Sequence, residues 1–334
     1  MRTAEANLLS KGSGTVIAVV DTGVAPHPDL QRNLLDGVDL TASHAPNGQR
    51  DSDGHGTAMA GLIVANGGST GGGVSGIAPE AKVLPIRAKI RNSEGDVADL
   101  VNGIEFAVSA GADVISISAA APADAQVQKA IKLAHQADVV VVASAGNTTS
   151  SSTVEYPARE PGVIAVGGID RQGNHADISV AGPEIDVVAP AVDIYSTGLN
   201  GGYRVGTGTS DATAIVAGAA ALIRSKYPNL PAQEVAHRLT ATAVDKGPPG
   251  RDDQYGYGVI DLVAALTADV PPLGFESSQV TPPASAETAP EKGRNKAATV
   301  RGLATLGVLV AAGGGYLFWR RRRRADDPPP RVSR

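Results

Sequence analysis

Between residues 16 and 166 the apolar positions form short unbroken runs that alternate with longer segments of helical spacing. The runs are rich in Val and Ile and are bounded by Gly, Asp or Pro, as expected of strands buried on both faces. Helical spacing covers Asp96–Ala110 and Ala123–Gln136. This alternation predicts an α/β fold with a mostly parallel sheet and helices on both faces. The expected strands are Val16–Val20, Val83–Ile86, Val114–Ile117, Val139–Ala143 and Val163–Val166.

The end of the chain carries a different pattern. Between Arg301 and Arg320 lie 18 uncharged residues, which as a helix span about 27 Å, close to the roughly 30 Å of a bilayer core. Tyr316 and Trp319 stand where an interfacial aromatic belt is expected, and a run of arginines follows directly. A Gly-rich helix buried in a protein core is the alternative, but the arginine run favours the membrane. The pattern predicts a transmembrane helix over residues 299–319.

The segments on either side of this helix complete the expected organisation. Residues 267–298 mix Pro with Ser, Thr, Glu and Ala without apolar periodicity, which is typical of a tether. Residues 1–266 are then the globular domain, and residues 320–334 form a basic tail that the positive-inside rule keeps in the cytoplasm. The domain is expected to face outward, at the cell membrane. Residues 1–14 lack the apolar core of an export signal, so either a leader precedes Met1 or the expected topology is wrong. We favour a leader.

Charge and composition exclude several classes of function. The chain has 29 Lys and Arg against 34 Asp and Glu, a net charge of −5. Seven Arg and two Asp give residues 320–334 a charge of +5, so residues 1–319 carry −10. Such an acidic domain argues against a nucleic-acid partner, since phosphate binding needs a basic surface. The absence of Cys excludes disulfides, thiolate metal sites and a cysteine nucleophile.

Three polar residues at the ends of these elements suggest chemistry when they are taken together. Asp21 follows a buried strand, His55 lies between glycines before an apolar helix over 58–65, and Ser210 precedes a helix over 211–224. Alone, each is ordinary: a turn residue, an inert loop histidine and an N-cap. A serine hydroxyl, however, becomes a nucleophile when a neutral imidazole takes its proton. The imidazole in turn needs a carboxylate to hold its tautomer, and the chain supplies all three.

Four short motifs resemble the signature blocks of the subtilisin-like serine proteases. They are DTG at Asp21, DGHGT at His55, AGN at Asn147 and GTS at Ser210. The similarity covers about residues 10–265, with every block in order. It implies a subtilisin-like fold in which Asp21 orients His55, His55 is general base and then acid, and Ser210 is the nucleophile. Asn147 matches the family's side-chain donor to the oxyanion.

The order of segments along the chain resembles that of one group within this family. A subtilisin-like domain followed by a Pro-rich tether, one C-terminal span and a basic tail is similar to the mycosins of actinobacterial type VII secretion. This resemblance implies a polypeptide substrate, a membrane partner reached through the C-terminal helix, and association with a type VII secretion complex. It implies no nucleic acid.

The resemblance also locates a pocket for the residue before the scissile bond. In the family this pocket lies between two backbone segments, here Ser118–Ala121 and Ala143–Asn147, with Glu155 at its floor. A carboxylate there would attract Lys or Arg, while the alanines favour slim side chains. Alternatively, Glu155 turns outward or pairs with Arg159. The expected substrate-binding residues are Ser118, Ala119, Ala120, Ala145, Gly146 and Glu155.

Some positions depart from the family pattern. Asp211 follows the expected nucleophile, and its charge could disfavour the oxyanion; Ala214 stands where the family usually has Pro. The loop Asn66–Gly76, where many relatives bind calcium, contains no carboxylate. We therefore expect no metal there and no cofactor, and calcium bound elsewhere stays open.

Two other functions compete with an active protease. One is a catalytically idle subtilisin-like scaffold that stabilises a secretion complex. The other is a nucleotide-binding domain, because Gly206 and Gly208 precede a helix, but the third glycine of the dinucleotide motif and the P-loop lysine are missing. Retention of the complete triad and of Asn147 favours the serine endopeptidase.

Overall fold

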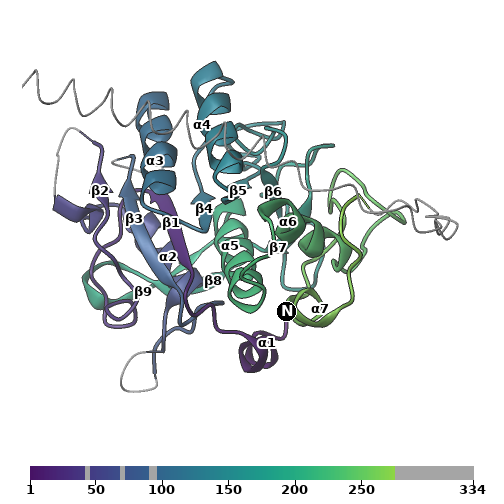
Figure 1. The fold of residues 1–334 in the computed structure, drawn as a ribbon, viewed down its shortest axis with the longest axis horizontal. Helices are drawn as coiled ribbons and strands as arrows, with labels where there is room; N and C mark the ends of the chain where they lie inside the picture. The colour runs from purple at the N-terminus through teal and green to yellow at the C-terminus, as the bar shows by residue number, and fades with distance from the viewer. Residues whose placement is uncertain (42–45, 68–71, 90–95, 275–334) are drawn as a thin grey trace, which may run out of the picture. The chain divides into compact units, whose positions relative to one another are not determined.

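The computed structural model of the protein describes residues 1–274, except for 42–45, 68–71 and 90–95. In this part of the chain a sheet of seven parallel strands has the order β2-β3-β1-β4-β5-β6-β7 (Figure 1). All five expected strands are present with slightly shifted ends, so the prediction of a mostly parallel sheet is confirmed. The strands are β1 (Val16–Asp21), β2 (Val38–Asp39), β3 (Lys82–Arg87), β4 (Val114–Ile117), β5 (Val140–Ser144), β6 (Ile164–Ile169) and β7 (Val187–Pro190).

Helices cover both faces of the sheet, as the alternating pattern predicted. The helices are α1 (Thr3–Leu9), α2 (His55–Val64), α3 (Val97–Ser109), α4 (Ala125–Gln136), α5 (Thr209–Lys226), α6 (Ala232–Ala241) and α7 (Leu262–Thr267). Helices α3 and α4 share one apolar core with the sheet. Helices α2, α5, α6 and α7 share the other core.

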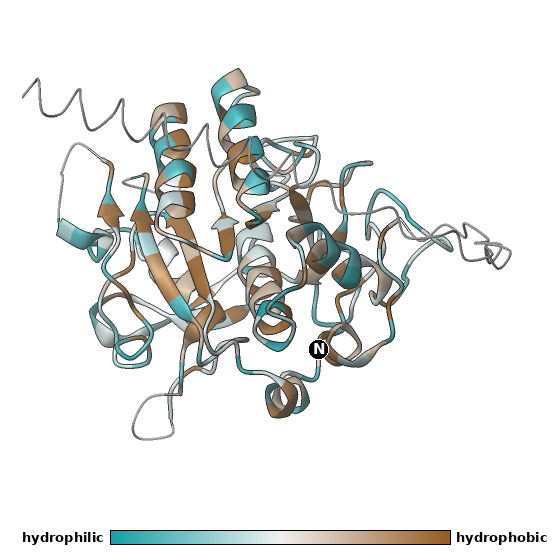
Figure 2. Ribbon diagram, viewed as in Figure 1, coloured by the Kyte–Doolittle hydropathy of each residue, from teal (hydrophilic) through white to brown (hydrophobic). Residues whose placement is uncertain are grey.

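Strand β1 shows how one strand supplies both cores. Ile17 and Val19 belong to the core beneath α2 and α5, while Ala18 and Val20 belong to the core beneath α3 and α4. Successive side chains of a strand point to opposite faces, so a strand buried on both faces has to be apolar throughout. Figure 2 shows these strands as hydrophobic, whereas α3 and α4 carry hydrophilic as well as hydrophobic residues.

Helix α5 is the central helix of its layer, and its residues from Thr209 to Arg224 are buried. Small residues allow this close packing: a Cβ added at Gly218 would lie 2.7 Å from Cβ of Ile77. The helix begins two residues before its predicted start at 211. Its first turn therefore includes Ser210 and lies next to the carboxyl ends of the strands, where active groups of parallel α/β folds collect.

Several short elements were not predicted from the sequence. They include α1, β7, α6, α7 and an antiparallel hairpin of β8 (Ile194–Thr197) with β9 (Tyr203–Gly206), which leads into α5. Two single-turn 3₁₀ helices, η1 (Pro46–Gly48) and η2 (Leu199–Gly201), complete the described elements. Helix α1 is part of the domain, because the Arg2 guanidinium donates to both carboxylate oxygens of Asp261 at 2.8 and 2.7 Å.

The domain continues beyond its predicted end at residue 266. The first residues of the predicted tether bond to α6: the Pro271 carbonyl lies 3.1 Å from Nε2 of His237, and the Leu273 N–H donates to Glu234 at 2.7 Å. The rest of the tether, the predicted transmembrane helix and the basic tail lie outside the described residues. Among the residues that are described, no helix is long and apolar enough to cross a membrane.

Candidate active site

The structure joins the first two residues of the predicted triad. Asp21 ends β1, His55 begins α2, and Nδ1 of His55 lies 2.8 and 2.9 Å from the two carboxylate oxygens of Asp21. Asp21 is 1% exposed and His55 6% exposed. An ionised carboxylate only accepts hydrogen bonds, so the proton of a neutral imidazole resides on Nδ1. This tautomer leaves Nε2 with a lone pair that can accept a proton.

Glycine lets α2 approach the end of β1 closely enough for this pair to form. A Cβ at Gly56 would lie 2.1 Å from the carbonyl oxygen of Gly23. Instead, the Gly56 N–H donates to the Thr22 hydroxyl at 2.9 Å, next to Asp21. Any side chain at position 56 would push the histidine away from its carboxylate.

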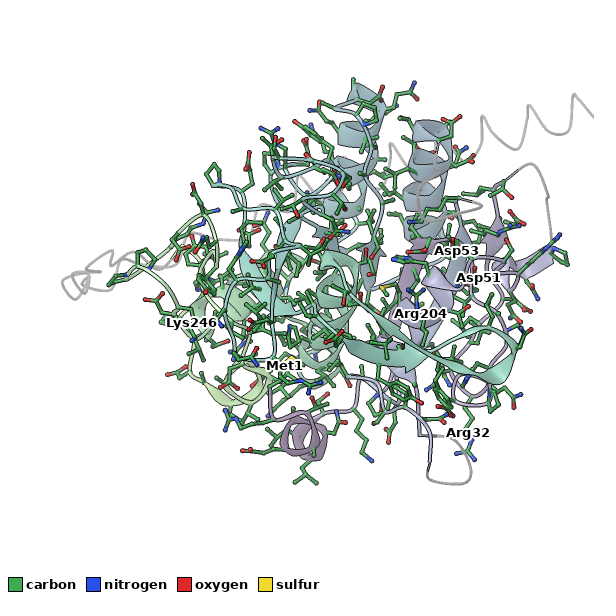
Figure 3. All side chains as sticks on the ribbon, turned by 180° about the vertical axis from the view of Figure 1, so that it is seen from behind. Met1, Arg32, Asp51, Asp53, Arg204 and Lys246 are labelled. Carbon is green, nitrogen blue, oxygen red and sulfur yellow. The ribbon has the colours of Figure 1, made fainter. Side chains whose placement is uncertain are left out.

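Asp51 holds the loop that carries His55, a role that the sequence analysis missed. One of its oxygens accepts from the Gly54 N–H at 2.8 Å, and the other accepts from the Thr57 N–H at 3.0 Å and hydroxyl at 2.7 Å. Asp51 and Asp53 lie on the side of the molecule that carries the β8–β9 hairpin (Figure 3). Gly54 is the N-cap of α2 and Asp51 lies three residues before it, so a capping motif does not identify Asp51 from the sequence.

The pKa of Asp21 reflects two opposing effects. Burial of the carboxyl raises the pKa, because the charged form loses hydration. The charges of His55 and Lys89, with hydrogen bonds from His55 and the Thr22 N–H, outweigh this effect and lower the pKa from 3.8 to about 2. Asp21 is therefore ionised at neutral pH and can accept the hydrogen bond of the Nδ1–H group.

Ser210 lies in the first turn of α5 and is 9% exposed. It lines a cleft together with Asn147 and Thr209. Among the described residues, the Ser210 hydroxyl makes no hydrogen bond to His55. The structure therefore joins two residues of the predicted triad, Asp21 and His55, while Ser210 lines the cleft. The first N–H groups of a helix lack intrahelical acceptors, and this end of α5 therefore favours negative charge.

Asn147 is held in one orientation by the residue before Ser210. Its Oδ1 accepts from the Thr209 N–H at 3.0 Å and from the Thr209 hydroxyl at 3.2 Å. A backbone N–H only donates, so the atom that faces it is the amide oxygen. The Nδ2 group is thereby left as the donor at this corner of the cleft. The role of Thr209 in holding Asn147 was not predicted from the sequence.

Most of the predicted pocket residues line the same cleft, and one does not. Ala145 is fully buried, and its carbonyl accepts from the Glu155 N–H at 2.9 Å. Its contribution is to hold Glu155, since its methyl group packs in the core. The predicted residues that line the cleft are Ser118, Ala119, Ala120, Gly146, Asn147, Glu155 and Ser210.

Glu155 turns into this cleft. A Cβ at Gly146 would lie 2.6 Å from one Glu155 oxygen, and the Ser150 hydroxyl lies 3.4 Å from the other. Burial raises the pKa of Glu155, against the effect of the Ser150 hydrogen bond. Arg159 instead bonds to Glu184 at 3.1 Å, so the alternative in which Glu155 pairs with Arg159 is wrong.

Asp211 places a second carboxyl beside the predicted nucleophile. It is 5% exposed and approaches Gly206, where an added Cβ would lie 2.8 Å from its Oδ1. Burial raises the pKa of Asp211 to about 6, although the charges of His55 and Arg204 act in the opposite direction. The carboxyl therefore changes charge near neutral pH, next to the group that would carry the reaction.

The described residues contain no group of three or more His, Asp or Glu side chains that could hold a metal ion. Near the loop Asn66–Gly76, the buried Asp29 accepts from the Val74 N–H at 2.7 Å and from the Tyr203 hydroxyl at 3.2 Å. Residues 68–71 of that loop lie outside the described residues.

Comparison with known proteins agrees with this geometry. Subtilisin DY of Bacillus licheniformis is 40% identical over 260 residues, which cover 76% of this chain and 92% of that one. The crystal structure of MycP1 with its N-terminal propeptide removed is 32% identical with a TM-score of 0.71, over 81% of this chain and 96% of that one. MycP3, described as a protease from the type VII (ESX-3) secretion system, is 34% identical with a TM-score of 0.69. The match covers 80% of this chain and 86% of that one.

These similarities confirm the expected subtilisin-like fold and the expected serine-protease type. The relatives include both subtilisins and MycP proteases. The family model for the subtilases matches residues 12–258. The chain belongs to the subtilase family of serine proteases.

Proposed function

We propose that the protein is a membrane-tethered serine endopeptidase, linked to type VII protein secretion, that cleaves peptide bonds through an acyl-enzyme. The observation that carries the proposal is the short Asp21–His55 hydrogen bond beside a cleft lined by Ser210 and Asn147. This arrangement supports the proposal, because Asp21, His55, Asn147 and Ser210 would each have a role in the mechanism.

In the proposed reaction the Ser210 oxygen attacks the scissile carbonyl carbon while Nε2 of His55 takes the hydroxyl proton. The carbonyl oxygen becomes an oxyanion that Nδ2 of Asn147 and the N–H groups at the start of α5 stabilise. The imidazolium, held by Asp21, then gives its proton to the leaving amine as the C–N bond breaks. Water attacks the acyl-enzyme by the same route, which frees Ser210 and the new carboxyl end.

The link to secretion and the membrane has separate support. Among the structural neighbours, MycP1 is described as a serine protease and MycP3 as a protease from a type VII secretion system. Residues 302–319 are uncharged and are followed by arginines, as in a single span with a cytoplasmic tail. The peptidase domain would then act on polypeptides at the outer side of the membrane.

An idle scaffold remains the second candidate because of one observation. The carboxyl of Asp211, which follows Ser210, is buried within reach of the His55 charge. A negative charge at this place opposes the oxyanion, and a protein that no longer cleaves peptides could tolerate it. Activity measured with and without this carboxyl separates the two functions.

Replacing Ser210 or His55 by Ala should abolish peptide cleavage without changing the fold. Each replacement removes the nucleophile or the base, and in subtilisin itself such changes cost about 10⁶ in kcat. The measurement is kcat with a peptide substrate, together with the melting temperature. A variant that keeps more than a few per cent of the activity and melts normally would contradict the assignment.

Asp211→Asn should be more active than the wild type above about pH 6 and equally active well below it. The folded-state pKa of about 6 exceeds the ordinary 3.8, so folding stability falls as pH rises from about 4 to 6. Removing the charge should then recover up to about 3 kcal/mol at pH 7. Melting curves and kcat/KM at about pH 4.5 and pH 8 check both effects. The exposed Asp177→Asn is the control, and an Asp211→Asn enzyme with lower activity at pH 8 would refute the inhibitory role.

Glu155→Gln should weaken cleavage after Lys and Arg relative to cleavage after Phe. The Glu155 carboxylate lines the cleft, where a cationic side chain of the substrate would find its only strong partner among the pocket residues predicted here. We expect the Lys-to-Phe ratio of kcat/KM to fall by about tenfold or more in matched peptides. Glu160→Gln is the control on the same segment. Equal ratios in the wild type and Glu155→Gln would show that Glu155 does not recognise the substrate.

Deleting residues 299–334 should release an active enzyme from the membrane. The deletion removes the apolar segment and the arginine run but no residue of the described domain. Cell fractionation followed by a peptidase assay on each fraction is the measurement. Recovery of the truncated protein with the membranes would point to another membrane contact.

A further inference from the structure

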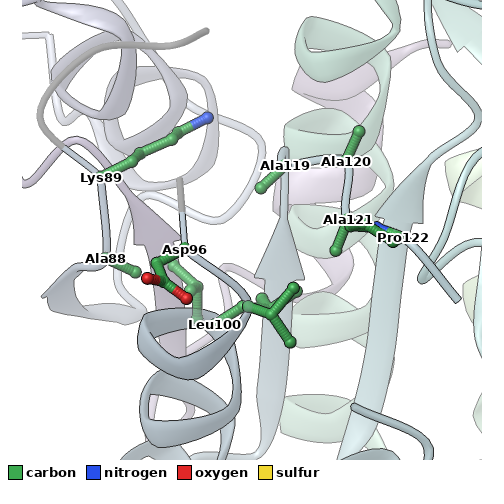
Figure 4. Close-up of a pocket in the computed structure, with 10 residues that line it drawn as sticks. Ala88, Lys89, Asp96, Leu100, Ala119, Ala120, Ala121 and Pro122 are labelled. Atoms are coloured by element: carbon green, nitrogen blue, oxygen red, sulfur yellow. The ribbon is translucent and has the colours of Figure 1, made fainter. Parts of the chain in front are cut away.

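A buried lysine lies beside the Asp21–His55 pair, and the proposed mechanism gives it no task. Lys89 follows the end of β3 and is 3% exposed. It lines both the Ser210 cleft and a neighbouring pocket with apolar walls that include Val20 and Leu100 (Figure 4). A methionine of similar length would fill this space without burying a charge. Because a buried ammonium costs several kcal/mol unless polar partners compensate, the partners of Lys89 indicate what it does.

The ammonium contacts two different parts of the active site. Its Nζ donates to the Ser118 carbonyl at 2.7 Å and lies 3.7 Å from Oδ1 of Asp21. That same oxygen of Asp21 lies 2.8 Å from Nδ1 of His55. Ser118 is the first residue of the segment predicted to face the substrate, and it follows β4 directly. One cation therefore joins the carboxylate of the triad to the start of the substrate-binding segment.

We propose that Lys89 is a positioning residue that sets the charge balance of the Asp21–His55 pair and holds the Ser118–Ala120 segment against it. The inference rests on the proposed proteolytic function. The ammonium, 3.7 Å from Oδ1 of Asp21, offsets part of the negative charge that this carboxylate presents to the imidazole. Removing the ammonium should therefore change the pH dependence of the reaction.

Other charged groups reach the same pair from further elements. Asp211 on α5 interacts with the charge of His55, and Arg204 on β9 interacts with that of Asp211. In the part of the chain that the structure describes, the charges that act on Asp21 are those of His55 and Lys89. In Figure 4 the Lys89 side chain extends away from the Asp96 carboxylate on the same wall. Lys89 is thus the described cation whose loss changes the field at Asp21 most directly.

The Ser118 contact adds a second, separable effect. The Ser118 carbonyl precedes the backbone of Ala119 and Ala120, which line the cleft. Loss of a charged donor to a buried carbonyl leaves that oxygen unsatisfied, and the segment can then shift. A shift of this segment changes substrate binding, which KM reports, whereas the charge on the pair determines the pH dependence of the reaction.

The test compares the pH profile of kcat/KM from about pH 5 to pH 9 for the wild type, Lys89→Met and Lys89→Arg. In Lys89→Met the midpoint of the acid limb should move up by about one pH unit, the size expected for one charge a few ångströms away. KM should rise severalfold. Lys89→Arg, which keeps the charge and a donor, should stay close to the wild type. Lys82→Met is the matched control, because Lys82 begins the same strand and its Nζ donates to the Arg32 carbonyl.

The outcomes separate this inference from the proposed function. If the wild type cleaves peptides and the pH profile of kcat/KM for Lys89→Met coincides with the wild-type profile, the proposed role of Lys89 is wrong and the protease assignment stays intact. A wild type that cleaves none of the peptides would overturn both. If Lys89→Met melts too low to assay, Lys89→Gln removes the same charge while keeping a donor for Ser118, and the expected pH shift is the same.

Discussion

A hydrogen bond between a buried carboxylate and an imidazole, at the carboxyl edge of a parallel sheet, is the interaction on which the site depends. Asp21 receives this bond because β1 ends in the middle of the sheet, between β3 and β4. Helix α2 can deliver His55 because Gly56 permits van der Waals contact with the turn after β1. Strand β1 and helix α2 thus fix the relative position of Asp21 and His55, the two groups whose geometry tolerates the least error.

Much of the fold and of the site could be predicted from the sequence for physical reasons. Strands buried on both faces must be continuously apolar, so β1, β4 and β5 were evident as runs. The hairpin β8–β9 was missed because it lies near the surface, where Tyr195 is 54% and Val205 59% exposed, and such strands carry no clean pattern. Helices α1 and α7 are short, and they are held by contacts between the two ends of the domain, namely the Arg2–Asp261 pair and the packing of Ala6 and Leu262 in the shared core.

The site residues likewise divide into those that local motifs predict and those that depend on contacts between distant segments. Asp21, His55, Asn147 and Ser210 stand in distinctive local motifs and could be selected from the sequence. Lys89 could not, because its importance comes from a contact with Asp21 across neighbouring strands. The same holds for Thr209, whose bonds to Asn147 depend on how α5 meets the loop after β5.

Three charged groups surround the predicted reaction centre, and each has a different physical effect. Lys89 offsets the charge of Asp21, Asp211 adds a carboxyl that ionises near neutral pH, and Glu155 brings a carboxylate to the cleft wall. Burial amplifies each charge, because a partly dry site screens it less than water does. The pH range and the preferred substrates of the enzyme should therefore depend on these groups rather than on the triad alone.

The central claim is that Ser210 is a nucleophile activated by the Asp21–His55 pair, and active-site labelling tests it most directly. The purified domain would be treated with a fluorophosphonate, and the modified peptide would be identified by mass spectrometry. We predict a single adduct on Ser210, because the neutral imidazole takes the proton of that hydroxyl. Absence of an adduct on the folded protein, or an adduct on another serine, would contradict it.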